Sequence, residues 1–287
     1  MGDLGALRAT LQQLDRIVVA FSGGADSSFL AWVATDTLGS ERVSCVTALS
    51  PSLASFEHDD CARLASEWGL NWLQVETAEM QNAAYRRNDA DRCFWCKDAL
   101  MDALEPIANE RDAVVVLGVN VDDLGDHRPG QRAAAERGAR FPLVEAGFTK
   151  SELRDASQRL GLSTWDKPAA ACLASRLPYG TPVEIGVLAS VEAAERGLRA
   201  LGFRDVRVRH YRELARVEVP VADLAALLDV RDQVVDAVKA AGYRYVTVDL
   251  EGLRSGNLNA ALELPPLKGR SGPTLPALKD GPQPHER

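Results

Sequence analysis

Hydrophobic residues in the first half of the chain fall into short continuous runs that alternate with longer amphipathic stretches. Runs rich in Val, Ile and Leu predict buried strands, and apolar positions spaced three or four apart predict helices. Apolar strands separated by helices are typical of a parallel sheet covered on both faces, so we expect a doubly wound α/β domain. The predicted strands are 16–21, 43–48, 71–76 and 113–119, and the predicted helices are 26–37, 55–68, 97–110 and 149–160. The last helix should begin with a capping box formed by Thr149 and Glu152.

The pattern changes in residues 164–182, which contain three prolines and no clear period and therefore indicate a functional loop. The following pattern predicts a smaller α+β unit: helix 185–201, strands 203–210 and 214–219, one or two helices within 221–241, and strand 243–250. Pro, Gly and charged residues dominate from residue 264 and are typical of a disordered tail. We divide the chain into an α/β domain (1–165), a loop or linker (166–182), a smaller α+β domain (183–262) and a tail (263–287).

Composition sets limits on partners and location. The chain has 287 residues, 46% of them hydrophobic and 26% charged, as expected of a folded domain. Its net charge of −8 and pI of about 5.2 disfavour unspecific nucleic-acid binding but allow a local basic pocket. We expect no membrane span and no secretory signal. The five cysteines, an odd number, indicate reduced thiols and a cytoplasmic protein.

Residues 22–28, Ser-Gly-Gly-Ala-Asp-Ser-Ser, connect the first predicted strand to the first predicted helix. Gly23 and Gly24 allow a tight turn and a close approach of the backbone to an anion. The start of a helix adds free N–H groups and the positive end of its dipole. Asp26 suits Mg²⁺ better than it suits phosphate. The hydroxyls that can add hydrogen bonds are those of Ser22, Ser27 and Ser28. The alternative is an ordinary strand-to-helix turn.

This segment lacks the lysine of a Walker A motif and the third glycine of a dinucleotide-binding loop. It resembles the PP-loop of ATP pyrophosphatases, Ser-Gly-Gly-x-Asp-Ser. The resemblance implies an enzyme that binds ATP at residues 22–28, holds Mg²⁺ at Asp26, and cleaves ATP between its α- and β-phosphates to form an adenylated intermediate.

Cys93 and Cys96 form a C-x-x-C motif, and Cys172 lies in the predicted loop. The motif alone fits a redox pair, half a zinc site or part of an iron–sulfur site. Zinc would need all three cysteines and one of the four histidines. Three thiolates on a [4Fe–4S] cluster would instead leave one iron open for an exogenous hydrosulfide. Of the other two cysteines, Cys45 in a strand and Cys61 on a helix are expected to be structural.

Taken together, these segments resemble the LarE family of ATP-dependent sulfur transferases, which help to build the nickel-pincer nucleotide cofactor. The resemblance covers about residues 10–262. Besides the phosphate loop, the matching segments are 92–97, 118–123, 141–143, 172–176 and 242–252.

The resemblance implies that a carboxylate of a pyridinium biscarboxylate mononucleotide is adenylated, and that sulfur then displaces AMP to give a thiocarboxylate. Some members sacrifice the sulfur of the cysteine that matches Cys172. Others use a [4Fe–4S] cluster on three cysteines, and the presence of Cys93 and Cys96 favours this type. The resemblance also implies a homo-oligomer, with a hexamer as the candidate form.

Further roles follow from the same resemblance. Arg207 and Arg209 alternate on one face of a predicted strand and match arginines that bind the substrate phosphate, as a pair of guanidiniums can do. Ser175 and Arg176, beside Cys172, would help to hold substrate or AMP. The alternative for the arginine pair is a solvated charged face.

Polar residues after the most apolar strand are further candidates, because ligands bind at this edge of open α/β sheets. Their alternative role is ordinary turn chemistry. These residues are Asn120, Asp122 and Asp123, of which Asn120 and Asp123 are assigned to ATP binding. We expect Trp95 either to cover the site or to pack in the core, and His210 to be structural. Glu195 and Glu218 are weaker candidates for an acidic or metal-linked cluster.

Three other functions compete with sulfur transfer to a small molecule. A tRNA-thiolating PP-loop enzyme should carry a basic RNA-binding surface, which the pI disfavours. An ammonia-using synthetase gives no reason for three cysteines. A nucleotide or cluster sensor would bind without turnover, and pyrophosphate release would distinguish it from an enzyme.

Overall fold

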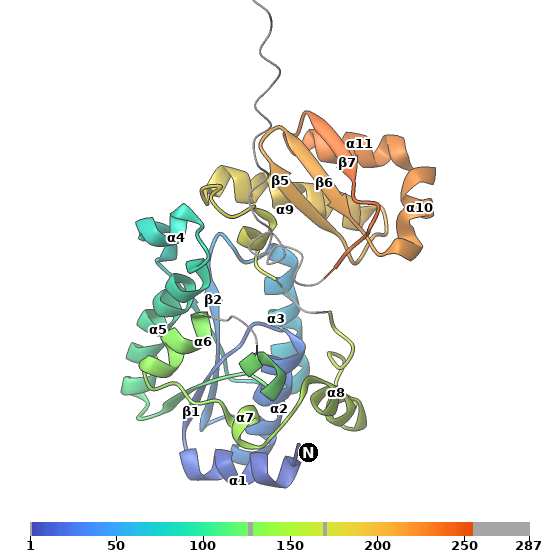
Figure 1. The fold of residues 1–287 in the computed structure, drawn as a ribbon. Coiled ribbons are helices and arrows are strands. Elements are labelled where there is room, and N and C mark those ends of the chain that lie inside the picture. The colour runs from blue at the N-terminus through green and yellow to red at the C-terminus, as the bar shows by residue number, and fades with distance from the viewer. Residues whose placement is uncertain (1, 126–128, 169–170, 255–287) are drawn as a thin grey trace, which may run out of the picture. The chain divides into compact units, whose positions relative to one another are not determined.

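A four-stranded parallel sheet with strand order β3-β2-β1-β4 organises the first part of the chain (Figure 1). The computed structural model describes residues 2–125, 129–168 and 171–254, all within one compact unit, Met1–Ser255. Its strands are β1 Ile17–Ala20, β2 Val43–Leu49, β3 Trp72–Glu76 and β4 Val114–Leu117. Because β2 and β3 lie on one side of β1 and β4 on the other, the direction of winding reverses between β1 and β4. This confirms the predicted α/β class. The predicted tail, 263–287, lies outside the described residues.

Helices pack on both faces of this sheet. They are α1 Leu4–Leu14, α2 Ala25–Leu38, α3 Ser55–Trp68, α4 Ala83–Arg87, α5 Arg92–Glu110, α6 Pro129–Glu136, α7 Pro142–Glu145 and α8 Lys150–Arg159, with short 3₁₀ turns η1 Glu79–Gln81 and η2 Val121–Gly125. Neighbouring residues of β1 point to opposite faces, so Ile17 and Val19 belong to one hydrophobic cluster and Val18 to another. Burial on both faces explains why β1 and β4 are continuously apolar.

Helix boundaries agree with the sequence in some places and not in others. The capping box of α8 is present: Thr149 Oγ1 accepts from Glu152 N–H, and Glu152 Oε2 accepts from Thr149 N–H at 3.0 Å. By contrast, α5 begins at Arg92 rather than at residue 97, so both cysteines of the C-x-x-C motif lie in its first turns.

The helices α1, α4, α6 and α7 were not predicted from the sequence. The first of these carries a recognisable signal, since its N-cap Asp3 accepts from Gly5 N–H and its buried Leu7 and Leu11 are four residues apart. The helices α4, α6 and α7 have only five, eight and four residues, too short for a clear period.

A second sheet has strand order β5-β6-β7, antiparallel between β5 and β6 and parallel between β6 and β7. Its elements are η3 Leu173–Arg176, α9 Ile185–Ala200, β5 Arg207–Tyr211, β6 Leu214–Glu218, η4 Val221–Asp223, α10 Leu224–Asp229, α11 Arg231–Ala240 and β7 Tyr245–Val248. The core around this sheet also includes Ala54 and Tyr85 from the first part of the chain. The domain boundaries at 165, 182 and 262 stay a prediction. No helix among the described residues is both long and apolar enough to span a membrane.

Candidate active site

The predicted phosphate loop follows β1 at the carboxyl edge of the parallel sheet and enters α2. Gly24 is the N-cap of α2 and has no side-chain cap, and Asp26 lies in the first turn. Within the loop, the Ser27 hydroxyl accepts from Ser22 N–H at 3.2 Å and donates to the Gly24 carbonyl at 3.2 Å. The Ser28 hydroxyl is buried without a hydrogen-bond partner among the described residues. An uncapped helix start lined with hydroxyls is chemically suited to bind phosphate.

Two glycines allow neighbouring elements to approach this loop closely. Gly23 has φ +69°, and a Cβ there would lie 3.0 Å from Cys61 Sγ on α3. Gly118 directly follows β4, and a Cβ at this position would lie 2.7 Å from Ser27 N and 2.8 Å from Ser27 Cα. Any side chain at residue 118 would therefore displace the backbone of the loop. Since β1 and β4 flank the reversal of winding, the loop lies where open α/β sheets bind ligands.

Residues after β4 form a hydrogen-bonded turn. Asn120 Oδ1 accepts from the N–H groups of Asp122 and Asp123, at 3.0 and 3.3 Å. Asp123 Oδ2 accepts from Asn120 N–H at 3.2 Å, and Asp122 Oδ2 accepts from Lys150 N–H at 2.8 Å. Asn120 is fully buried, and its Nδ2 has no partner among the described residues. These oxygens support the turn, and the Asn120 amide nitrogen is left as a buried donor. Its assignment to ATP binding stays a prediction.

The start of α5 carries the C-x-x-C cysteines and a buried arginine. Cys93 is exposed and Cys96 is partly buried. Arg92 is only 3% exposed and donates to Asn88 Oδ1 at 2.6 Å and to the Ala174 carbonyl at 2.8 Å. Its Nη2 lies 3.9 Å from Cys93 Sγ. One guanidinium thus connects the C-x-x-C helix to the segment that follows Cys172.

Cys172 is exposed at the N-cap of η3. The next residue, Leu173, donates its N–H to the carbonyl of Ser52 at 2.8 Å. Ser52 follows β2, and its hydroxyl shares a hydrogen bond with the buried Tyr85 hydroxyl on α4. Since β1 and β2 are parallel neighbours, the Cys172 segment is attached to the same edge of the sheet from which the phosphate loop extends.

The charges of Cys93 and Cys172 act on both Cys96 and Arg92. Burial, followed by the charges of Cys172, Glu79 and Cys93, raises the pKa of Cys96 to about 12 even though Lys97 acts in the opposite direction. Burial lowers the pKa of Arg92, but Cys172 and Cys93 act against burial, and the net shift is upward. No group of three or more His, Cys, Asp or Glu side chains in the described part of the chain is arranged to hold a metal ion. The geometry of the described side chains therefore supports neither a zinc site nor an iron–sulfur site at these cysteines.

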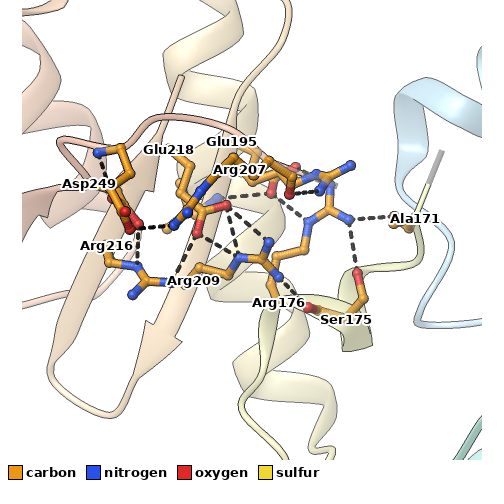
Figure 2. Close-up of polar contacts among 12 residues, drawn as sticks. Ala171, Ser175, Arg176, Glu195, Arg207, Arg209, Arg216, Glu218 and Asp249 are labelled. Carbon is orange, nitrogen blue, oxygen red and sulfur yellow. Dashed lines mark hydrogen bonds and ion pairs between the residues drawn. The ribbon is translucent and has the colours of Figure 1, made fainter. Parts of the chain in front are cut away.

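Two fully buried carboxylates bind arginines beside the Cys172 segment, as Figure 2 shows. The first is Glu195, which accepts from Arg176 Nε at 2.8 Å and from Arg199 Nη2 at 3.0 Å. Arg176 also donates from Nη1 to the carbonyls of Ala171 and Cys172. Burial raises the pKa of Glu195, but the charge and hydrogen bonds of Arg176 more than offset it, so the net shift is downward.

The second carboxylate is Glu218, which lies 3.0 Å from both Arg209 Nε and Arg216 Nη2. Arg209 also donates from Nη1 to the carbonyl of Ser175 at 2.7 Å. Burial and the guanidiniums of Arg176 and Arg209 lower the pKa of Arg207. Positive groups packed this closely favour an anion. The assignment of a substrate phosphate to these arginines and Ser175 stays a prediction.

Lys167 carries a partly buried ion triad that was not predicted from the sequence. Its Nζ lies 2.7 Å from Glu57 Oε2 and 2.8 Å from Asp60 Oδ2, both on α3. Backbone atoms of the same stretch of α3 lie next to Gly23 of the phosphate loop. The triad thus attaches the segment before Cys172 to the helix beside the phosphate loop.

Other residues serve mainly to support these elements. Trp95 is half-buried, packs in the core and donates to Asp91 Oδ2 at 2.9 Å. His210 is buried against Tyr243, as expected of a structural residue. Arg92 lies in the matched segment 92–97 but was given no role, and no motif surrounds Lys167 or Tyr85. The roles of all three arise from contacts between distant segments.

The fold and the loop define a PP-loop ATP pyrophosphatase. In agreement, the family model described as NAD synthase matches residues 7–103, which include β1, β2, β3 and the phosphate loop. An uncharacterised Synechocystis protein is 45% identical over 259 residues, which cover 89% of this chain and 96% of that protein.

The pyridinium-3,5-bisthiocarboxylic acid mononucleotide synthase of Lactiplantibacillus plantarum is 40% identical over 257 residues, 89% of this chain and 93% of that enzyme. An uncharacterised Methanocaldococcus jannaschii protein is 27% identical over 84% of this chain and 91% of its own length. The chain belongs to the LarE family of ATP-dependent sulfur transferases.

Proposed function

We propose that the protein adenylates a carboxylate of a pyridinium carboxylate mononucleotide and then replaces one carboxylate oxygen with sulfur. The substrate class comes from the name of the L. plantarum relative, a synthase of pyridinium-3,5-bisthiocarboxylic acid mononucleotide. The observation that carries the proposal is the attachment of the Cys172 segment, through Ser52, to the sheet edge from which the phosphate loop extends. Activation and sulfur delivery can then occur in one site.

The first step requires ATP at the phosphate loop. A substrate carboxylate oxygen attacks the α-phosphorus, the bond to the β-phosphate breaks, and pyrophosphate leaves. Backbone N–H groups at the start of α2 and the hydroxyls of Ser22, Ser27 and Ser28 would bind the phosphates. Asp26 would hold Mg²⁺, which neutralises the leaving pyrophosphate. Asn120 and Asp123 would contact the nucleotide.

The second step transfers sulfur. A sulfur nucleophile attacks the acyl carbon, the bond from that carbon to the AMP oxygen breaks, and AMP leaves with both electrons. The product is a thiocarboxylate. The arginines at 176, 207 and 209, together with Ser175, would hold the substrate phosphate and keep its carboxylate near Cys172.

Two sulfur sources fit these residues. Cys172 alone could attack and then lose its sulfur by β-elimination, which leaves dehydroalanine. We favour a [4Fe–4S] cluster held by Cys93, Cys96 and Cys172, because the chain carries the C-x-x-C pair together with the third cysteine and each thiol can become a ligand on losing its proton. The described side chains are not arranged as a metal site, so the three thiols would have to move together to bind the cluster. When bound, the cluster would supply an iron that carries hydrosulfide. We also retain a cytoplasmic homo-oligomer, with a hexamer as the candidate form, as part of the proposal.

The test is anaerobic turnover with ATP, Mg²⁺ and pyridinium-3,5-biscarboxylic acid mononucleotide. Pyrophosphate release that depends on this substrate, and a product in which sulfur replaces oxygen by mass spectrometry, are expected. Asp26→Asn should abolish both. Release without sulfur transfer, or no release at all, would contradict the proposal.

The sulfur source is settled by iron analysis together with the mass of the protein after turnover. With a cluster, iron is lost in Cys93→Ala, Cys96→Ala and Cys172→Ala but retained in the control Cys45→Ala, whose thiol lies in a core strand. With sacrificial chemistry, wild-type protein binds no iron and residue 172 becomes dehydroalanine.

A further inference from the structure

Asn88 is a fully buried residue at the end of α4 that has been given no role in the reaction so far. It is the C-cap of this helix, and its backbone is left-handed with φ +58°. Glycine adopts this conformation without strain, and asparagine is the usual alternative. Within the described part of the chain, the hydrogen bonds of the Asn88 side chain all go to residues outside α4. The reason for an amide at this position therefore lies in what it holds and not in the helix that it ends.

The Asn88 amide uses both of its donors and its acceptor. Nδ2 donates to the carbonyls of Pro178 and Thr181, each at 2.8 Å, and Oδ1 accepts from Arg92 Nη1 at 2.6 Å. The backbone carbonyl of Asn88 also accepts from Gly180 N–H at 3.0 Å. One buried residue thus binds three positions of a chain segment that begins 90 residues further along the sequence.

Arg92 extends this attachment toward Cys172. The same Nη1 that donates to Asn88 also donates to the carbonyl of Ala174 at 2.8 Å. The pair of Asn88 and Arg92 therefore holds three carbonyls of the stretch 173–183, those of residues 174, 178 and 181. The Cys172 thiol, which is exposed, belongs to the residue directly before this stretch.

Backbone hydrogen bonds fix the two ends of the stretch 173–183. The N–H of Leu173 donates to the carbonyl of Ser52, and the N–H of Val183 donates to the carbonyl of Arg86, each at 2.8 Å. Attack on an acyl carbon is fast only when the reacting atoms are held close to the attack geometry, and a misplacement of about 1 Å can cost about 10²-fold in rate. A stretch fixed at both ends and at three carbonyls is suited to hold residue 172 in such a geometry.

We propose that Asn88 is a positioning residue for sulfur transfer and not for adenylation. Acting through Arg92 and the stretch 173–183, its amide holds residue 172 where sulfur can reach the acyl carbon of the adenylate, with either sulfur source. None of the described hydrogen bonds of Asn88 reaches the phosphate loop, residues 22–28, so the first step should not need the amide. This inference rests on the proposed two-step reaction.

Loss of the amide should give water the advantage over sulfur. Water then attacks the acyl carbon, the bond from that carbon to the AMP oxygen breaks, and AMP leaves with both electrons. The attacking water loses its protons to solvent, and the original carboxylate is restored. Such a variant would still cleave ATP to AMP and pyrophosphate but would form little thiocarboxylate.

The experiment compares full-length wild type, Asn88→Gly and the control Asn82→Ala in anaerobic turnover with equimolar ATP, Mg²⁺ and pyridinium-3,5-biscarboxylic acid mononucleotide. Asn88→Gly removes the amide but tolerates the left-handed backbone. Asn82 is the N-cap of the same helix and accepts from Ala84 N–H at 2.8 Å, so its substitution removes a structural asparagine at the other end of α4. The measured quantities are pyrophosphate, thiocarboxylate and their ratio, together with hydrogen exchange of residues 173–183.

In Asn88→Gly, we expect pyrophosphate release at the wild-type rate, a ratio of thiocarboxylate to pyrophosphate that falls by about 10- to 100-fold, and faster exchange in residues 173–183. Asn82→Ala should keep the wild-type ratio. Unfolding of part of the sample lowers both products equally, so a purely structural defect leaves the ratio unchanged. Asn88→Asp keeps the acceptor for Arg92 but loses both donors, and it serves as a second variant if Asn88→Gly folds poorly; its ratio should also fall.

The results that would overturn the inference are distinct from failure of the proposed function. A wild-type ratio in both variants of Asn88, or an equal fall in Asn82→Ala, would exclude a positioning role for the amide. Loss of pyrophosphate release in folded Asn88→Gly would do the same, because the residue would then serve adenylation. Wild-type protein that releases no pyrophosphate would instead contradict the proposed function itself.

Discussion

Arg176 and Glu195 form an ion pair in which the arginine Nε lies 2.8 Å from Glu195 Oε1 and both side chains are almost completely buried. The same guanidinium donates from Nη1 to the carbonyl of Cys172 at 3.2 Å. A carboxylate on α9 therefore helps to fix the backbone that presents the Cys172 thiol. Arginine suits this position because its planar fork can bind a carboxylate and still reach a carbonyl.

Glu195→Gln should destabilise the protein and loosen the Cys172 segment. Removing one partner of a buried ion pair leaves Arg176 without its counter-charge, so we expect the free energy of unfolding to fall by about 3–5 kcal/mol. Denaturant unfolding measures this loss. The matched control is Asp232→Asn, which breaks an exposed pair with Arg231 and should change stability by less than about 1 kcal/mol. Equal effects of the two substitutions would contradict the role given to the buried pair.

The five thiols of the iron-free protein should separate into two reactivity classes. Cys93 and Cys172 are exposed. Burial raises the pKa of Cys45 and Cys96 to about 12 and that of Cys61 to about 11. Since the thiolate is the nucleophile, iodoacetamide at pH 8 should label the exposed pair first.

The reactivity of Cys96 should be set by the fold. Because burial raises the pKa of Cys96 to about 12, the thiol of the folded protein stays protonated above its unfolded pKa. The contribution of the protonated thiol to stability is fully present below the unfolded pKa and is lost as the pH rises through the folded value. Peptide mass spectrometry after timed alkylation, with and without denaturant, measures the order of labelling. Labelling of Cys96 as fast as that of Cys93 in the folded protein would show that the thiol is not protected.

The sequence predicted the elements whose signals are local. The strands of the parallel sheet, the capping box at Thr149 and the phosphate loop all depend on neighbouring residues, and the structure contains them. Local signals could not give the start of α5 at Arg92, because this end of the helix has no side-chain cap and Arg92 is held by the distant carbonyl of Ala174. The ion triad of Lys167 and the contacts of Asn88 depend on tertiary packing in the same way.

Gly118 is another residue whose role depends on tertiary packing and not on local sequence. Gly118 lies in a segment that the sequence analysis matched to the LarE family, yet its contact with Ser27 becomes visible only when β1 and β4 lie side by side. The structure thus gives a physical reason for a residue that sequence reasoning could only match.

Gly118→Ala should impair the phosphate loop. The added Cβ would lie 2.7 Å from Ser27 N, and the obstacle is backbone, which cannot rotate away. We expect a loss of about 1–3 kcal/mol of stability from overpacking and weaker ATP binding by calorimetry. The control is Gly186→Ala in the first turn of α9, where nothing lies within 4 Å of the new Cβ; it should be neutral or slightly stabilising. ATP affinity unchanged in Gly118→Ala would contradict this account of the loop.

The ion triad of Lys167 should make the stability of the protein depend on pH. Burial lowers the pKa of Lys167, but hydrogen bonds and charges from Asp60 and Glu57 more than offset it, and the net shift is upward. Burial raises the pKa of Asp60, but Lys167 more than offsets it, and the net shift is downward. The lysine therefore stabilises the fold below its unfolded pKa and loses this effect as the pH rises through the folded value. The aspartate stabilises it above its unfolded pKa and loses this effect as the pH falls through the folded value.

Lys167→Met should lower Tm by a constant amount between about pH 5 and pH 9, where both partners are charged. Below about pH 3.9 the gap to wild type should shrink because Asp60 becomes protonated, and above about pH 10.4 it should shrink because the ammonium of wild type is lost. Thermal unfolding across this range measures the gap, with Lys239→Met, an exposed lysine of α11, as control. A gap that stays the same at both extremes would mean that lost packing of the lysine stem, rather than its charge, destabilises the variant. The triad holds the segment before Cys172 against α3. A gap that shrinks at both extremes would therefore also mean that the attachment of this segment depends on pH.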